Sequence, residues 1–391
     1  MSWLRIGKRS EKIVAVADIG SGSAGFSIAA LRSGAPASVL AASRGILPIE
    51  ERTQEATLKG IAELLKKAGV DAIRSYGERA GKEARPIEEA YIIMRAPWSK
   101  SKTARAEAAF EQETRITPRI IGQLAQQALT NEKEMDQSNI LEGSVMRVEL
   151  NGYPTGQPVG KYARSITVLV LVSEGNATAR AEIVSAMGTI VPHVVPQLRS
   201  STRALIMVLR ARASREEQIF VIDMGSDGTS MFAIRAGAPV EHALVAEGMR
   251  TILRRIAPKG LPEETLSLMR MLSRDQCSSA ACEALQAAII AAEPELVRIF
   301  GESLAKCASP RRLPNRMLLV AHPDLMTWLS TFFSRIDFAQ FTQTTQPFSV
   351  TTLSLPDIAA WVVPQSGAIP DAALALDVAL VALEAGHSHV G

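Results

Sequence analysis

Two short segments of this 391-residue chain carry the same set of chemically capable residues, an aspartate followed by glycine and serine in a tight turn. Successive backbone N–H groups in such a turn form a concave site for anions. A carboxylate beside the turn could hold Mg²⁺ through water, since this ion keeps much of its hydration shell. The candidate residues are Asp18, Gly20, Ser21 and Gly22 in the first segment and Asp223, Gly225, Ser226 and Thr229 in the second.

The two segments belong to a longer repeat that covers residues 16–48 and 219–248. An Arg-x-Gly-Ala-Pro sequence at 32–36 recurs at 235–239. The copies stand too far apart for a solenoid, whose period is roughly 20–50 residues. The repeat therefore predicts two related lobes, each presenting an Asp-x-Gly turn, and two facing turns would clamp the phosphates of a nucleotide. The alternative is a pair of ordinary hairpins that a duplicated fold has retained, and the repeat alone leaves both open.

The first turn also spells GxGxxG through Gly20, Gly22 and Gly25. In a dinucleotide-binding fold these glycines open a helix, and an acidic residue follows about 20 residues later. Here residues 26–31 have the pattern of a strand, and the Gly-Ala-Pro sequence at 34–36 stops any helix. The next apolar run contains no acid. The context therefore argues against a dehydrogenase.

Composition limits the classes of protein further. Hydrophobic residues make up 47% and charged residues 21%, which is typical of a globular protein, and the length predicts roughly two to four domains. The 43 basic and 40 acidic residues give a net charge of +3, so we expect no nucleic-acid partner. No apolar run reaches the ~18–20 residues of a transmembrane segment. The first residues lack the apolar region of a secretory signal.

The three cysteines, Cys277, Cys282 and Cys307, have no metal-type spacing and cannot all pair with each other. Reduced thiols in a cytosolic compartment are the expected state. We therefore expect a cytoplasmic protein, which could reach the inner face of the membrane through a partner.

Two basic stretches are candidate contact surfaces. The densest contains Arg199, Arg203, Arg210, Arg212 and Arg215. Its first two arginines share a face of a predicted helix and could receive an acidic peptide or a lipid headgroup, although a solvated helix edge is the alternative. An exposed Trp98 between basic residues would also suit a protein contact.

Apolar runs and turn residues predict a meander of strands followed by a helix at the start of each lobe. In the first lobe the expected elements are strands at 13–17, 26–31 and 38–42 and a helix at 54–68, with a polar boundary at 74–87. Farther on we expect three strands, at 144–150, 163–172 and 189–195. The expected helices start at Thr117-Pro118, cover 197–212, and cover 278–307 with an interruption at Pro294. The predicted organisation is a first lobe at 1–87, an inserted α+β unit at 88–173, a return to the first lobe at 174–216, a second lobe at 217–361, and a C-terminal helix at 362–391 that packs back on the first lobe.

These segments resemble the actin-like ATPase superfamily, and within it the bacterial division protein family FtsA. The segment ADIGSGSAGFSIAAL resembles the first phosphate loop of that family, and VIDMGSDGTSMFAIRAG resembles the second. The small subdomain of FtsA has its counterpart in two consecutive segments of this chain, which resemble it: ITPRIIGQLAQQAL and VMRVELNGYPTGQPVGKYARSITVLVLV. The resemblance spans nearly the whole chain. It implies an α/β, duplicated actin-like (ribonuclease H-like) two-lobed fold with an inserted FtsA-type α+β subdomain. It also implies ATP between the lobes and Mg²⁺ held through water at Asp18 and Asp223.

Two departures from the family weaken the expected nucleotide site. Asp227 adds a carboxylate where phosphate should approach the second loop. The adenosine-side turn is His322-Pro323-Asp324 in place of Gly-Gly, and proline has no N–H to donate. Losing two hydrogen bonds at ~0.5–1.5 kcal/mol each would weaken ATP binding ~5- to 150-fold.

The resemblance implies a scaffold in bacterial cell division that recruits the tubulin homologue FtsZ, could self-assemble, and has weak ATPase activity at most. The turns at Leu150–Tyr153 and Pro158–Lys161 favour this FtsA-like interpretation. The first alternative is a PilM-like adaptor of type IV pilus assembly, which would bind a short cytoplasmic peptide of a membrane protein in the groove of the inserted subdomain. The second is an ATP-dependent small-molecule kinase on the same fold, with Asp227 as the candidate carboxylate.

Overall fold

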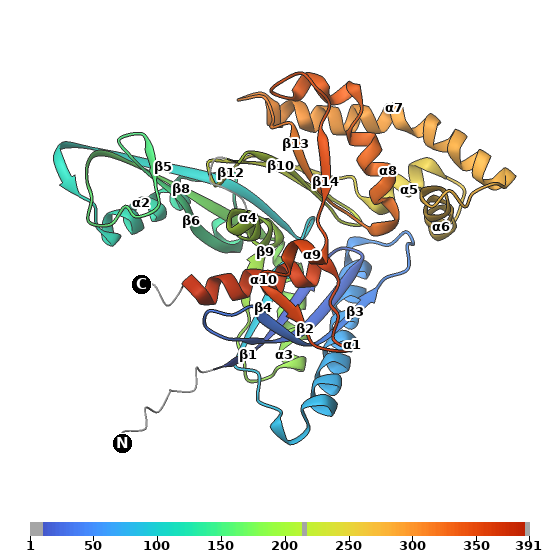
Figure 1. The fold of residues 1–391 in the computed structure, drawn as a ribbon, viewed down its shortest axis with the longest axis horizontal. Coiled ribbons are helices and arrows are strands. Elements are labelled where there is room, and N and C mark those ends of the chain that lie inside the picture. Colours follow the sequence, from blue (N-terminus) through green and yellow to red (C-terminus); the bar gives the residue numbers. More distant parts are fainter. Residues whose placement is uncertain (1–10, 213–216, 388–391) are drawn as a thin grey trace, which may run out of the picture.

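The computed structural model describes residues 11–212 and 217–387, which form three sheets (Figure 1). The six-stranded sheet has the order β15 (Val362–Pro364), β3 (Ala37–Ile46), β2 (Ser23–Leu31), β1 (Lys12–Ile19), β4 (Glu89–Met94) and β9 (Gln197–Ser200). The five-stranded sheet has the order β12 (Ala238–Val245), β11 (Thr229–Arg235), β10 (Ile219–Met224), β13 (Arg316–Val320) and β14 (Ser349–Thr352). The four-stranded sheet has the order β5 (Ser99–Arg115), β8 (Tyr162–Gly175), β6 (Ile140–Leu150) and β7 (Tyr153–Thr155).

The six- and five-stranded sheets repeat one topology. In each, a meander of three antiparallel strands is extended by a strand parallel to the first, β4 beside β1 and β13 beside β10. Asp18 stands opposite Gly25 in the first meander, and Asp223 stands opposite Ser230 in the second. The two aspartates therefore occupy equivalent positions near the ends of equivalent strands, as the sequence repeat predicts.

Helices cover both lobes. The first sheet is covered on one face by α1 (Gln54–Ala80) and α3 (Ala177–Ile190), and the second by α5 (Met249–Ile256), α6 (Pro262–Ser273), α7 (Ala280–Ala308) and α8 (Pro323–Phe333). The remaining helices are α2 (Pro118–Asn131), α4 (Ser201–Arg212), α9 (Leu355–Ile358) and α10 (Ala372–His387), and short 3₁₀ turns lie at Gly81–Glu83, Gln137–Asn139 and Ile336–Phe341.

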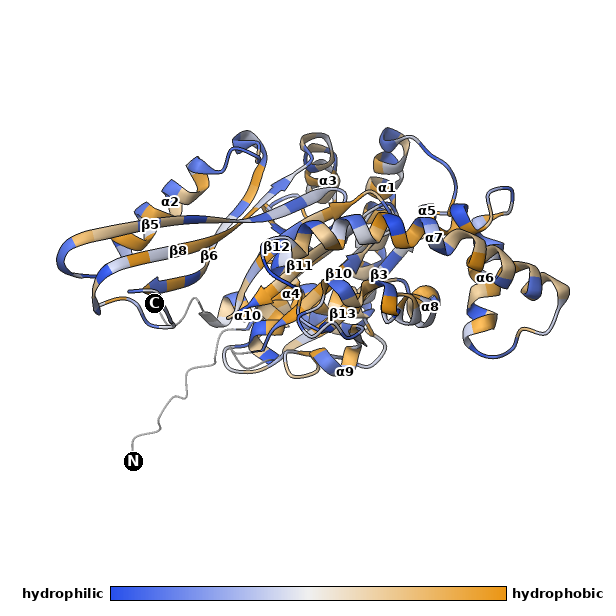
Figure 2. Cartoon of the chain, turned by 90° about the horizontal axis from the view of Figure 1, so that it is seen from above, coloured by the Kyte–Doolittle hydropathy of each residue, from blue (hydrophilic) through white to orange (hydrophobic). Residues whose placement is uncertain are grey.

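The two lobes share one buried core through α4 and α10. Leu205 of α4 and Leu380 of α10 belong to the same buried cluster as Val16 of β1 and Val221 of β10. Apolar residues concentrate where these helices meet the strands, whereas the four-stranded sheet extends to one side (Figure 2). A helix that is apolar on most faces is typical of a buried position. This shared core fixes the lobes relative to each other.

The inserted subdomain consists of the four-stranded sheet and α2. Thr117 caps α2 by accepting the backbone N–H of Ile120 (3.3 Å), and Pro118 is the first helical residue, so the predicted helix start is observed. The sequence places the start of the insertion at residue 88. In the structure β4 pairs with β1 in the first-lobe sheet, and the four-stranded sheet begins only at Ser99.

Several predicted elements differ in extent. Helix α1 continues through the expected polar boundary at 74–87 as far as Ala80, because Tyr76 continues its buried stripe. The run at 189–195 forms no strand, and residues 197–200 form β9 because they pair with β4. Helix α7 passes through Pro294 without interruption.

The prediction of three reduced cysteines is wrong in this structure. Cys277, in the loop after α6, and Cys282, in the first turn of α7, form a disulfide with their Cα atoms 5.7 Å apart. Cys307 is free and buried. Sequence alone does not show that the α6–α7 turn brings the first two thiols together. Within the described residues, each helix is too short or too polar to cross a bilayer.

Candidate functional site

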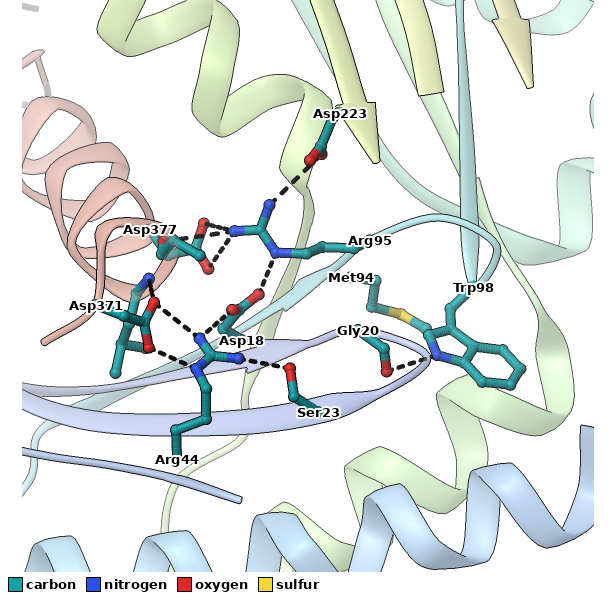
Figure 3. A network of polar contacts seen from close by, with 12 residues as sticks. Asp18, Gly20, Ser23, Arg44, Met94, Arg95, Trp98, Asp223, Asp371 and Asp377 are labelled. Atoms are coloured by element: carbon teal, nitrogen blue, oxygen red, sulfur yellow. Dashed lines mark hydrogen bonds and ion pairs between the residues drawn. The ribbon is translucent and has the colours of Figure 1, made fainter. Parts of the chain in front are cut away.

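The twin aspartates meet on a single guanidinium group (Figure 3). Arg95 directly follows β4 and lies between the lobes. Its Nε donates to Asp18 Oδ1 at 2.5 Å, and its Nη1 lies 3.5 Å from Asp223 Oδ2. Only 1% of Asp18 and 5% of Asp223 is exposed. The expected meeting of the two carboxylates at a shared cleft is therefore present, with an arginine between them.

Arg95 also binds the C-terminal helix. Its Nη2 donates to Asp377 Oδ1 of α10 at 3.2 Å, and Asp377 is fully buried. One guanidinium thus contacts carboxylates from β1, β10 and α10. The network links both lobes and the helix between them.

A second arginine, Arg44 of β3, occupies the other oxygen of Asp18. Arg44 Nη2 donates to Asp18 Oδ2 at 2.5 Å, and its Nε donates to Asp371 Oδ2 at 2.5 Å. Its Nη1 donates to Ser23 Oγ at 2.9 Å. A Cβ on Gly25 would lie 2.8 Å from Arg44 Nη2, so the glycine leaves room for this side chain. Both oxygens of Asp18 are therefore bound to guanidinium groups.

The carboxylates of this network differ in pKa. Burial raises the pKa of Asp18, but the charges of Arg95 and Arg44 outweigh burial and lower it to about 2. Burial raises the pKa of Asp377 well above its usual value, against the attraction of Arg95. Burial also raises the pKa of Asp223.

The two Asp-x-Gly hairpins contact each other directly. Ser21 Oγ accepts the backbone N–H of Asp227 at 3.0 Å. A Cβ on Gly22 would lie 2.7 Å from Cβ of Ser226. Glycine is required at position 22 because the opposite hairpin leaves no room for a side chain there.

Substituting Gly22→Ala should lower the free energy of unfolding by ~1–3 kcal/mol, because an overpacked contact forces one hairpin to move. The measurement is urea unfolding of the wild type and the variant. The matched control is Gly22→Ala combined with Ser226→Gly, which removes the opposing Cβ. We expect the second change to restore much of the loss, and additive losses would contradict a direct contact between the hairpins.

Other groups of the two hairpins also have protein partners. Thr229 Oγ1 donates to Glu247 O at 2.6 Å, and Asp227 Oδ1 accepts from Arg250 Nε at 2.5 Å. Trp98 Nε1 donates to Gly20 O at 2.9 Å. The prediction of an exposed Trp98 is wrong, since only 2% of this residue is exposed. Its indole holds the first hairpin in place.

The adenosine-side turn is used as a helix start. His322 caps α8 by accepting the N–H of Asp324 at its Nδ1 (3.3 Å), and Pro323 is the first helical residue. Asp324 is paired with Arg270 of α6. The residues that depart from the family sequence therefore hold α8 against α6.

The residues present do not fit a magnesium nucleotide. A cation beside Asp18 or Asp223 would face the Arg95 guanidinium, which already contacts both carboxylates. Phosphates would have to separate two hairpins joined by the Ser21–Asp227 hydrogen bond. Within residues 11–212 and 217–387, no group of three or more His, Cys, Asp or Glu side chains is placed to hold a metal ion.

Comparisons with known proteins identify the fold. No protein-family model matches the sequence, and no curated protein matches it. The solved structure of a PilM-PilN type IV pilus biogenesis complex is similar with a TM-score of 0.60 at 15% identity, covering 96% of this chain and 99% of that chain. The ethanolamine utilization protein EutJ from Carboxydothermus hydrogenoformans has a TM-score of 0.44 at 10% identity, covering 97% of this chain and 92% of that chain. A Bacteroides thetaiotaomicron protein with an actin-like ATPase fold has a TM-score of 0.34 at 8% identity, covering 97% of this chain and 99% of that chain. The similarity to the chain of the PilM-PilN complex, together with the repeated topology of the two lobes, supports the predicted two-lobed actin-like fold.

Sequence reasoning missed four residues of the actin-like cleft, namely Arg44, Arg95, Asp371 and Asp377. One signal was available for Asp377, because it is a single charge within the apolar run ALALDVALVAL. A lone carboxylate in a buried helix needs a partner. Nothing local, however, indicates that the partner lies far away in sequence, just after β4.

A second feature of the actin-like chain is a groove of about 1060 Å³ between the inserted subdomain, α4, α10 and the second-lobe sheet. We call it the arginine groove. The arginines that line it are Arg147, Arg199, Arg203, Arg210, Arg212 and Arg316, beside two acidic residues, Glu217 and Glu384. Apolar side chains between them are Met146, Val148, Met207, Leu209 and Leu318.

The arginines of this groove differ in their availability. Arg199 and Arg203, predicted to receive an acidic partner, both bind Glu142 and Glu384 inside the protein. Arg199 belongs to β9 and not to the predicted helix. Among the described residues, Arg212 and Arg316 each form one ion pair, and 47% and 55% of their side chains are exposed. These two offer their remaining N–H donors to a ligand. Arg215 lies outside the described residues.

Proposed function

We propose that this chain is a PilM-like adaptor, which binds a short segment of a partner protein in the arginine groove. Two observations support this function. The similarity to the chain from the PilM-PilN complex extends over nearly all of both chains. The arginine groove offers a site for a protein segment beside the inserted subdomain.

The chemistry of the groove defines the segment that would fit. Val145, which is 41% exposed, and the partly buried Met207 provide apolar surface, and methionine adapts to ligands of different shape. Arg212 and Arg316 place guanidinium groups at the exposed part, where they can bind carboxylates in a bidentate manner. A segment with alternating acidic and apolar side chains meets both requirements. In a PilM-like adaptor it would be a short cytoplasmic peptide of a membrane protein.

The experiment titrates labelled synthetic peptides into the full chain and follows fluorescence anisotropy. The peptides cover cytoplasmic segments of the pilus-assembly membrane proteins from the same cell, and the C-terminal tail of FtsZ is the rival ligand. We expect an acidic and apolar pilus peptide to bind. The variant Arg212→Ser/Arg316→Ser should weaken binding about tenfold, a loss of about 1.4 kcal/mol.

The matched control is Arg298→Ser, which removes an arginine of similar exposure from α7, outside the groove. This variant should bind the peptide like the wild type. Equal weakening by the control, or binding unaffected by the groove variant, would exclude the groove as the site. Binding of the FtsZ tail alone would instead favour the FtsA-like scaffold in cell division.

The other predicted functions receive less support. A small-molecule kinase requires ATP between the hairpins, where Ser21 and Asp227 are hydrogen-bonded to each other. ATP hydrolysis, self-assembly and location at the inner membrane face stay predictions. None of them is needed for an adaptor that binds a peptide beside the inserted subdomain.

A further inference from the structure

We infer that Arg95 takes the place of a magnesium nucleotide, so that this chain keeps its lobes closed by its own side chains and does not depend on ATP. The inference concerns the cleft between the lobes. It is independent of the arginine groove and of the identity of any partner.

The first argument is charge. Arg95 bridges Asp18 and Asp223, the two carboxylates that would attract a cation, and Arg44 binds the second oxygen of Asp18. A divalent ion would meet two fixed positive charges in a site from which water is largely excluded, where repulsion is much stronger than in water. Displacing Arg95 would also leave its own charge buried without a partner.

The second argument is the use of the hairpin groups. The backbone N–H groups of Gly20 and Gly225 donate within their own hairpins, to Ser23 O at 3.0 Å and to Gly228 O at 2.8 Å. Ser21 Oγ accepts from the opposite hairpin. A nucleotide would have to break the bond between the hairpins before its phosphates could enter.

The third argument is that the ion-pair network connects both lobes and α10. Through Asp223, Asp377 and Asp18, Arg95 joins the second lobe, α10 and the first lobe at one point. A bound nucleotide in an open cleft would make the same connection only when present. Here the connection is part of the chain and is present at any ATP concentration.

The experiment measures thermal unfolding of the full chain with Mg-ATP, with Mg-ADP and with Mg²⁺ alone, each at millimolar concentration, together with calorimetric titration of Mg-ATP. A ligand that binds the folded state raises Tm. We expect no rise in Tm and no heat of binding for the wild type. A rise with Mg-ATP that Asp18→Asn abolishes would overturn the inference.

The variant Arg95→Ala tests the replacement itself. Removing the guanidinium leaves Asp18 and Asp223 without their shared cation, so Mg²⁺ alone should raise Tm of this variant and not that of the wild type. Arg95→Ala with Asp18→Asn is the matched control and should lose the response. If Arg95→Ala does not fold, Arg95→Gln is measured in the same way. Absence of a magnesium response in the folded variant would show that Arg95 does not occupy a cation site.

Discussion

Replacing Arg95 by methionine should lower the free energy of unfolding by roughly 3–5 kcal/mol, the largest effect that we expect from a single polar residue here. Methionine keeps most of the volume and removes the charge. Asp223 and Asp377 then lose their guanidinium partner while they stay buried, and Asp18 keeps only Arg44. The loss is large because a buried carboxylate without a partner retains its full desolvation penalty.

Urea unfolding, followed by far-UV circular dichroism, measures this loss. Arg298→Met is the matched control, since its side chain is 56% exposed and pairs only with Glu295 and Glu302 on the same helix. An exposed pair contributes about 0–1 kcal/mol, so the control should unfold near the wild type. Adding Asp223→Asn to Arg95→Met should recover part of the loss, because the buried carboxylate that has lost its guanidinium partner disappears. A loss below about 1 kcal/mol for Arg95→Met would contradict a stabilising role of the network.

The sequence was sufficient to predict the duplicated fold for a physical reason. Each meander is built from local features, namely a buried strand, an Asp-x-Gly turn and a second strand with an Arg-x-Gly turn after it. Because these features recur in order, they predict equivalent strands and place Asp18 and Asp223 at equivalent positions. The cap at Thr117 was predictable for the same reason, since Thr followed by Pro acts within one helical turn.

The chemistry of the cleft was not predictable, because its partners come together only in the folded chain. Nothing in the sequence links Arg95 or Arg44 to the Asp-x-Gly turns, although the folded chain brings both arginines to Asp18. Asp377 stands in an apolar helix near the other end of the chain. Gly25 appeared to belong to a dinucleotide fingerprint, whereas its missing side chain leaves room for Arg44. Long-range ion pairs of this kind leave no periodic signal in the sequence.

The contact between the inserted subdomain and the second lobe contains a histidine with an unusual environment. Thr103 Oγ1 of β5 donates to Pro239 O at 2.6 Å and lies 3.0 Å from His242 Nε2 of β12. A hydroxyl has one proton, so His242 must donate its Nε2–H to Thr103, and Nδ1 carries no proton. Burial, together with the charge of Lys102, lowers the pKa of His242 to about 4.

This histidine should make the contact sensitive to acid. A base whose pKa is lower in the folded state than in the unfolded state binds its proton first in the unfolded chain. The stability that it contributes is therefore complete above about pH 6.5 and is lost as pH falls toward 4, by about 1.4 kcal/mol per pH unit. Four cations and two carboxylates surround the adjoining cavity. They are Lys100, Lys102, Arg105 and Arg147, with Glu134 and Glu241. Their excess of positive charge disfavours a protonated imidazole.

His242→Gln is the decisive variant, because glutamine can still donate to Thr103 and cannot take up a proton. We expect wild type and variant to have similar stability at pH 7, and the wild type to lose up to ~3 kcal/mol relative to the variant by pH 4.5. Urea unfolding at half-unit steps of pH measures the difference between the two curves. Three buried carboxyls have raised pKa values and therefore stabilise the fold more as pH falls, namely Asp223, Glu142 and Asp377. Both proteins contain them, so their contribution to stability cancels in this difference. Parallel curves would show that His242 does not control the acid stability of the chain. Divergence below pH 6.5 would identify the protonated imidazole at this contact as a group that destabilises the folded chain in acid.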